Sequence, residues 1–173
     1  LLNNETSGIM IYGPNSAGKS AIMKTIGIAI VMAQCGLYVA AEYFEYNIFT
    51  SLYTRISGND NIFKGHSSFI VEMIELRNIL ANSDKNTLVI GDELTRGTQH
   101  TDGSAIVATA ITMLSKKNVK FLFATHLHDL PTLKEIKELN NIKFFYLSVE
   151  QHNDKLVFSR KLIEGTGERS EEH

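Results

Sequence analysis

The sequence contains few of the residues that crosslink small secreted proteins or bind metals through sulfur. Its 173 residues include one cysteine, two prolines and no tryptophan. A single cysteine excludes an internal disulfide and a cysteine-based metal site, so an intracellular, reducing compartment is expected. Cys35 lies in an apolar helical stretch and is predicted to be a buried, inert thiol.

An excess of charge of one sign is also missing. The formal net charge is −2, from 17 basic and 19 acidic residues. Phosphate backbones select basic surfaces, which argues against a nucleic-acid clamp formed by this chain alone.

The longest apolar segment, residues 22–39, is interrupted by Lys24, Thr25 and Gln34. It is therefore predicted to be a core helix, and no membrane partner is expected.

The sequence does contain short apolar runs that alternate with helical patterns in a single globular domain. Hydrophobic residues make up 43% of the chain, enough for a sizeable core. Strand patterns occupy residues 8–12, 48–57, 87–91, 119–124, 143–149 and 155–162. Helical patterns occupy residues 19–35, 67–82, 102–116 and 128–139. This order predicts an α/β sandwich with a mostly parallel sheet, whose last two strands form an antiparallel edge and turn at Asn153 and Asp154.

The most specific motif follows the first apolar run and has the pattern G-x-x-x-x-G-K-[ST]. It comprises Gly13, Pro14, Asn15, Ser16, Ala17, Gly18, Lys19 and Ser20, followed by Ala21. Glycines let backbone N–H groups curl around phosphates, and the helix that begins here directs its positive end at them. Lys19 is expected to reach the β- and γ-phosphates of a nucleotide, and Ser20 to bind Mg²⁺. The alternative is a glycine-containing turn that merely resembles such a loop.

Two adjacent acids follow the apolar run at residues 87–91. Ligands of open α/β sheets bind at the carboxyl ends of the strands, so the acids would lie beside the phosphate-binding loop. Asp92 is predicted to hold Mg²⁺, and Glu93 to orient and deprotonate the water that attacks the γ-phosphate. The alternative is that both acids cap the segment 94–97, which would be favoured if no phosphate-binding loop lay upstream.

Further polar residues are candidates for the same edge. His126 follows the run 119–124 and would lie near the two acids, where an imidazole can sense the γ-phosphate. Ser67 and Ser68 stand at the start of a helical pattern. They are either its N-cap or a hydroxyl group that binds the γ-phosphate held by a second subunit. Asp102 is the predicted N-cap of the next helix.

These blocks occur together, in this order and spacing, in one protein family. The blocks are residues 13–20, 34–39, 67–73, 92–98 with 102–103, and 123–126. The chain resembles the ATPase domain of the MutS family of DNA mismatch-repair proteins. Its tail from Arg160 to Gly167 is similar to that of MutS relatives from large viruses and octocoral mitochondria.

The resemblance implies a P-loop NTPase fold of the ABC type, a three-layer sandwich with a mostly parallel central sheet and an antiparallel edge. It implies DNA-dependent ATP hydrolysis with Mg²⁺ in a dimer, where one subunit's phosphate-binding loop and the other's Ser67 hold each nucleotide. By the same resemblance the catalytic residues are Glu93, His126 and Lys19, and the metal ligands are Ser20 and Asp92. The loop that links the two nucleotide sites comprises Arg96, Gly97 and Thr98.

The resemblance also implies partners and missing parts. The partners are a second MutS-type subunit, identical or not, mismatched double-stranded DNA, and a MutL-like protein or a nuclease. Residues 1–173 would be an ATPase domain truncated at both ends, without the upstream mismatch-binding, clamp and lever domains and without the C-terminal dimerisation helices. Residues that stack on adenine would lie mostly in the missing parts, so the isolated piece is expected to bind ATP weakly and not to hydrolyse it.

Some positions depart from the family pattern. Ser16 and Ala17 stand where Met-Gly is usual, Ala21 replaces Thr, and Thr95 replaces Gly. None of these changes removes a catalytic group, but Thr95 restricts the backbone beside the acids and puts communication between the two sites in doubt.

Two other functions are open: another DNA-associated ABC ATPase, which would carry Leu-Ser-Gly-Gly at the signature serine, and a nucleotide-binding module without turnover.

Overall fold

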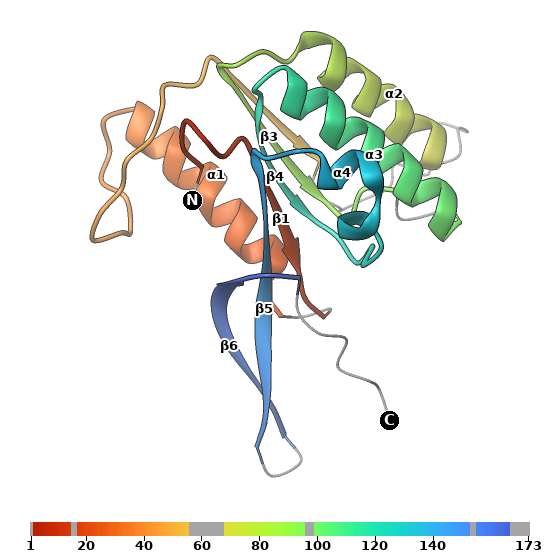
Figure 1. Cartoon of the computed structure of the whole chain (residues 1–173). Helices are drawn as coiled ribbons and strands as arrows, with labels where there is room; N and C mark the ends of the chain where they lie inside the picture. The colour runs from red at the N-terminus through yellow and green to blue at the C-terminus, as the bar shows by residue number, and fades with distance from the viewer. Residues whose placement is uncertain (1, 15–16, 56–67, 96–98, 153–154, 167–173) are drawn as a thin grey trace.

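One six-stranded mixed sheet organises the chain, with helices on both of its faces (Figure 1). The computed structural model describes residues 2–14, 17–55, 68–95, 99–152 and 155–166. The strands are β1 (Gly8–Tyr12), β2 (Ser51–Arg55), β3 (Thr87–Asp92), β4 (Lys120–Ala124), β5 (Ile142–His152) and β6 (Lys155–Glu164). The helices are α1 (Lys19–Gln34), α2 (Ser68–Asn82), α3 (His100–Lys116), the 3₁₀ turn η2 (Leu130–Thr132) and α4 (Lys134–Lys137).

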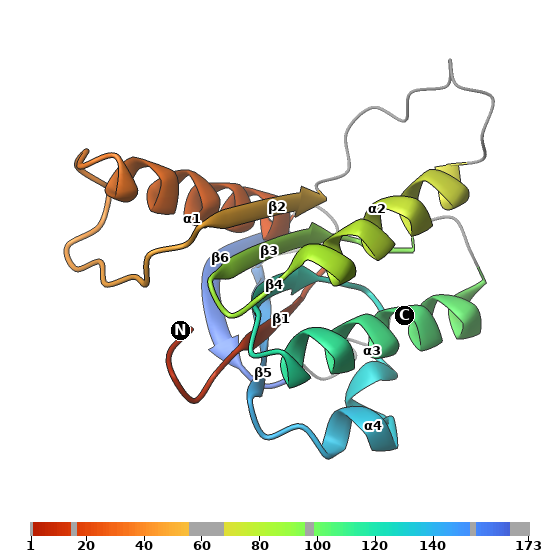
Figure 2. The same ribbon diagram turned by 90° about the horizontal axis from the view of Figure 1, so that it is seen from above.

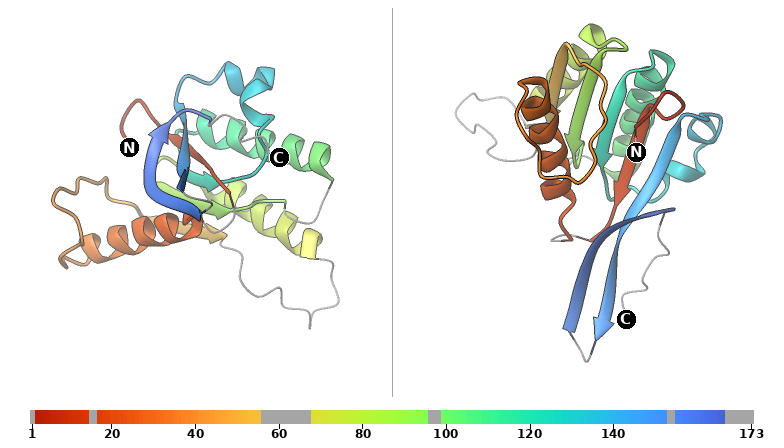
Figure 3. Two further views of the ribbon diagram at one scale, coloured as in Figure 1. Left: turned by 90° about the horizontal axis from the view of Figure 1, so that it is seen from below. Right: turned by 90° about the vertical axis from the view of Figure 1, so that its left-hand side faces the viewer.

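The strand order is β2-β3-β4-β1-β5-β6. In this order, every neighbouring pair from β2 through β1 to β5 is parallel, whereas β5 and β6 pair antiparallel. The predicted mixed α/β fold with an antiparallel edge is therefore confirmed. The β5–β6 hairpin extends well beyond the other strands (Figure 3).

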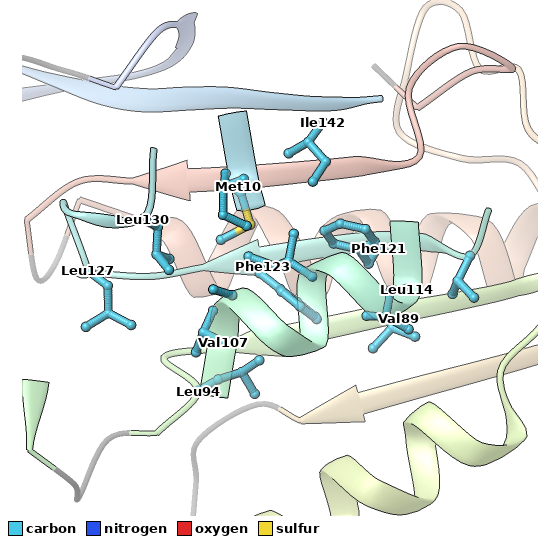
Figure 4. Close-up of a cluster of buried hydrophobic side chains, with 14 of the residues drawn as sticks. Met10, Val89, Leu94, Val107, Leu114, Phe121, Phe123, Leu127, Leu130 and Ile142 are labelled. Carbon is cyan, nitrogen blue, oxygen red and sulfur yellow. The ribbon is translucent and has the colours of Figure 1, made fainter. Parts of the chain in front are cut away.

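The central strands β1, β3 and β4 are buried along their whole length because both faces of the sheet are covered. Alternate residues enter two separate cores. Met10, Phe121 and Phe123 pack with α3 and with the segment of η2 and α4 on one face (Figure 4). Ile9, Ile11 and other residues of the opposite face pack against Met23 and Ile30 of α1. Figure 2 shows α1 on one side of the strands and α3 and α4 on the other.

Several predicted element boundaries were wrong. Of the strand predicted at residues 48–57, residues 51–55 form β2 and residues 48–50 lie outside it, whereas residues 56–57 fall outside the described part of the chain. The helix predicted at 128–139 is broken into η2 and α4, because Pro131 lies in the 3₁₀ turn and Leu133 between the two pieces is extended. Helix α3 begins at His100 with Gln99 as its N-cap, so Asp102 lies within the first turn instead of capping it. The predicted turn at 153–154 lies outside the described residues.

The apolar segment at residues 22–39, predicted to be a core helix, is helical only as far as Gln34 and is buried on one face only. One face of α1 is buried, but Ile28 and Val31 are exposed. The prediction of a buried Cys35 was wrong: the residue caps the exposed end of α1 and its thiol is accessible. Among the residues that the structure describes, no helix is both long and apolar enough to cross a membrane.

Close packing of β1 on β4 makes Gly8 sensitive to substitution. A Cβ atom at Gly8 would lie 2.0 Å from the Phe121 ring, which is fully buried beside Phe123. We expect Gly8→Ala to lower the free energy of unfolding by about 2 to 3 kcal/mol in urea titrations. The control is Gly36→Ala, at an open position with φ 74°, which should cost only about 1 kcal/mol. An equal loss in both variants would contradict this account.

Candidate functional site

The loop that is predicted to bind phosphate joins β1 to α1 at the carboxyl end of the parallel strands. Gly13 and Gly18 have φ values of 151° and 103°, which glycine adopts at little cost. Between them, the N–H of the buried Ala17 donates to Pro14 O at 3.2 Å. Helix α1 starts directly afterwards at Lys19, so its first backbone N–H groups face this loop. Asn15 and Ser16 lie outside the described residues, and Ala21 is an exposed residue in the first turn.

Lys19 is buried inside the loop that carries it. Its Nζ donates to Gly13 O at 2.6 Å and to Pro14 O at 3.2 Å, and it lies 3.9 Å from Glu93 Oε1. Burial lowers the pKa of the Lys19 ammonium, while the charges of Glu93 and Asp92 oppose that shift. The ammonium is thus held by loop carbonyls and lies beside the Glu93 carboxylate that follows β3.

The two acids occupy different environments at the end of β3. Asp92 is buried and accepts a hydrogen bond from the Ser20 hydroxyl of α1. Glu93 follows with φ 50°, and its N–H donates to Ala124 O at 3.0 Å. The Glu93 side chain is 17% exposed, more open than that of Lys19 at 5%. One carboxylate therefore lies against the first turn of α1, and the other is accessible to solvent.

The residues at this edge fit a magnesium ion. Ser20 and Asp92 bring a hydroxyl and a carboxylate oxygen into contact. Mg²⁺ prefers hard oxygen ligands and is usually held by one or two protein groups together with phosphates and water. Ser20 and Asp92 are thus the described residues that would hold it.

His126 lies at the same edge as the acids. The strand register pairs Asp92 with Ala124, so His126 comes two residues beyond the end of the same ladder, with an exposed side chain. Its approach to a γ-phosphate stays a prediction. Ser67 and the residues Arg96, Gly97 and Thr98 lie outside the described part of the chain, and so do their predicted roles. Ser68 is the first residue of α2.

Similarity to known proteins decides the family. The profile of the family described as MutS domain V matches residues 9–171, nearly the whole chain. The chain belongs to the MutS family. It is 48% identical over 172 residues to a mimivirus protein from Acanthamoeba polyphaga mimivirus named as a DNA mismatch repair mutS homolog, covering 96% of this chain and 15% of that protein.

Two further relatives come from other sources. A mitochondrial DNA mismatch repair protein mutS homolog of Sarcophyton glaucum is 37% identical over 94% of this chain and 16% of its own length. A DNA mismatch repair protein MutS of Methanosarcina mazei is 38% identical over 96% of this chain and 19% of its own length. The predicted similarity to MutS proteins of large viruses and octocoral mitochondria is confirmed. This MutS chain spans less than a fifth of the length of these three relatives.

The prediction from sequence missed two structural features of this MutS chain. Glu72 is buried on α2, and its Oε1 accepts a hydrogen bond from the Thr95 N–H at 2.6 Å. The sequence did carry a signal for this contact, because Glu72 lies on the same helical face as the apolar residues Leu76 and Ile79. A carboxylate buried on such a face needs a hydrogen-bond partner.

The second missed feature is a polar group at the end of β1. His128, to which no role was assigned, stacks on the Tyr12 ring with centroids 5.3 Å apart. Burial, with a contribution from the charge of Asp129, raises the pKa of the Tyr12 phenol well above its usual range, so the phenol stays neutral.

The charges around Lys19 lead to a pH-dependent expectation. Glu93→Gln removes the larger of the two opposing charges, so the Lys19 pKa should fall further below its usual value. NMR titration of the Lys19 Nζ signal would measure this change. The control is Glu75→Gln, which removes a carboxylate that pairs with Arg55 at 3.2 Å and is not among the charges acting on Lys19. An unchanged or higher Lys19 pKa in Glu93→Gln would contradict the close approach of the Glu93 carboxylate to the Lys19 ammonium.

Proposed function

We propose that this chain is the ATP-binding and ATP-hydrolysing domain of a DNA mismatch-repair protein, built as an ABC-type P-loop sandwich. One observation carries the proposal: Lys19 and Ser20 of a glycine-bounded loop meet Asp92 and Glu93 at the carboxyl edge of a parallel sheet. Family membership and the names of the relatives support the link to mismatch repair.

The residues have separate tasks in binding. ATP places its phosphates at the first N–H groups of α1, where the helix end favours negative charge. Lys19, which bonds to Gly13 O and Pro14 O, would exchange these acceptors for phosphate oxygens when ATP binds. Ser20 and Asp92 would hold Mg²⁺, which would supply positive charge to offset that of the phosphates.

Hydrolysis needs a base beside the γ-phosphate. Glu93 is the more exposed of the two acids, and it accepts the proton of the water that attacks phosphorus in line. The bond from the γ-phosphorus to the bridging oxygen breaks, and the products are ADP and inorganic phosphate. Lys19 lies beside Glu93, where its ammonium stabilises the charge that develops on the phosphate oxygens.

In the full protein, the nucleotide would lie between two MutS-type subunits, with Ser67 supplied from the second subunit and His126 sensing the γ-phosphate. ATP binding and hydrolysis would then control the binding of mismatched double-stranded DNA and the formation of a sliding clamp. A MutL-like partner or a nuclease would act next. The exposed thiol of Cys35 suits a reducing intracellular compartment.

The first test is the steady-state ATPase rate of the full-length protein on a single-mismatch duplex and on a homoduplex of equal length. The rates should differ between the two duplexes. Glu93→Gln should lower the rate by about 100-fold or more, because it removes the base, while ATP binding is retained. Equal rates on both duplexes would favour another DNA-associated ABC ATPase. No rate above the Glu93→Gln blank would favour a nucleotide-binding module without turnover.

The 173-residue chain alone should behave differently. We expect it to bind ATP far more weakly than the full-length protein and to show no hydrolysis, because the proposed site needs a second subunit to supply Ser67 and the chain spans less than a fifth of its relatives' length. Titration calorimetry of both proteins with Mg²⁺-ATP measures this difference. Equal affinity of the two would show that the described site is sufficient for binding.

A further inference from the structure

A buried carboxylate ties helix α2 to the turn that carries Glu93. Glu72 is only 8% exposed, and its Oε1 accepts the Thr95 backbone N–H at 2.6 Å. The two residues are 23 positions apart in the sequence, so the bond joins separate elements. A carboxylate is costly to bury and is tolerated where it is hydrogen-bonded. Leucine or another apolar residue at this position would pack in the core without that cost, but could not accept the N–H.

The turn after β3 needs such a partner. Glu93 and Thr95 have φ values of 50° and 67°, in the left-handed region that side chains rarely adopt. Thr95 is β-branched, which makes this conformation still less favourable. A turn that contains two such residues persists only if its surroundings hold it in place.

Contacts hold the turn at both ends and in the middle. At its start, the Glu93 N–H donates to Ala124 O of β4 at 3.0 Å. In the middle, Leu94 is 5% exposed and packs in the core (Figure 4). At its end, Glu72 holds the Thr95 N–H. The bond to Glu72 is supplied by a side chain of α2 and acts on the backbone of the turn.

We infer that Glu72 is a positioning residue for ATP hydrolysis. Its carboxylate fixes the Thr95 amide and thereby the turn that directs the Glu93 carboxylate toward Lys19, 3.9 Å away. This inference rests on the proposed function, since it assigns Glu93 as the base. The bond also links the turn of Glu93 to the first part of α2, which begins at Ser68, about one helical turn before Glu72. A shift of the start of α2 against the sheet is therefore transmitted to Glu93.

The test compares three variants of the full-length protein. Glu72→Gln keeps an acceptor oxygen at the same reach, whereas Glu72→Asp keeps the charge but shortens the side chain by about 1.5 Å. Glu75→Ala is the matched control, because it removes a carboxylate from the same helix that pairs with Arg55 instead. Two quantities are measured: kcat and KM for ATP, and the hydrogen exchange rate of the Thr95 amide.

We expect Glu72→Asp to lower kcat by about 10- to 100-fold with KM changed less than about threefold, because the base is misdirected while the phosphate-binding loop is intact. Thr95 amide exchange should accelerate in the same variant. Glu72→Gln should keep kcat within about fivefold of the wild type and retain the amide protection, and Glu75→Ala should match the wild type in both measurements.

Two results would overturn the inference. In one, the wild type hydrolyses ATP above the Glu93→Gln blank and Glu72→Asp is equally active. In the other, Glu72→Gln loses as much kcat as Glu72→Asp, which would show that an acceptor oxygen is not the required feature. A wild-type rate no higher than the blank is a different failure, that of the proposed function. The two failures are thus distinguished by the wild-type rate alone.

Discussion

The burial of one ammonium group, Lys19 Nζ, is the constraint on which the arrangement of the site depends. A buried cation needs nearby acceptors and negative charge, and Lys19 finds them in Gly13 O, Pro14 O and the Glu93 carboxylate that follows β3. These groups come from strands that are not neighbours, because β4 lies between β3 and β1. Ala124 of β4 pairs with Ile11 on one side and with Asp92 on the other. The register of one central strand thus brings the loop and the acids together.

The two cores explain why this register is secure. Residues of β1, β3 and β4 alternate between a face covered by α1 and a face covered by α3 and its neighbours. A slip of one residue would exchange the two faces of a strand, moving Phe121 and Phe123 into the space fitted to Leu122 and Ala124. Apolar packing in the two cores therefore maintains an unfavourable arrangement at the carboxyl edge of the sheet, where a buried lysine, a buried aspartate and two left-handed residues of one turn lie.

The strand patterns and the motif residues could be predicted because their signals are local. Continuous apolar runs mark β1, β3 and β4, and the G-x-x-x-x-G-K-S pattern marks the loop before α1. The errors have local causes too. Pro131 interrupts a helical pattern that spacing alone extends over residues 128–139, and Cys35 caps the end of a helix that is covered on one face only. A single sequence shows that an apolar face exists, but not whether anything packs on it.

The sequence by itself determined the family, the mixed α/β order of elements and the identity of the charged groups at the carboxyl edge of the sheet, because each follows from residue types at fixed short spacings. Only the tertiary structure decided which groups meet. The contact of Ser20 with Asp92 and that of Glu72 with Thr95 join residues far apart in the chain, and both depend on the strand order and on how the helices pack against the sheet. Such contacts leave no periodic signal, since a hydrogen bond between distant residues constrains two positions without constraining those between them.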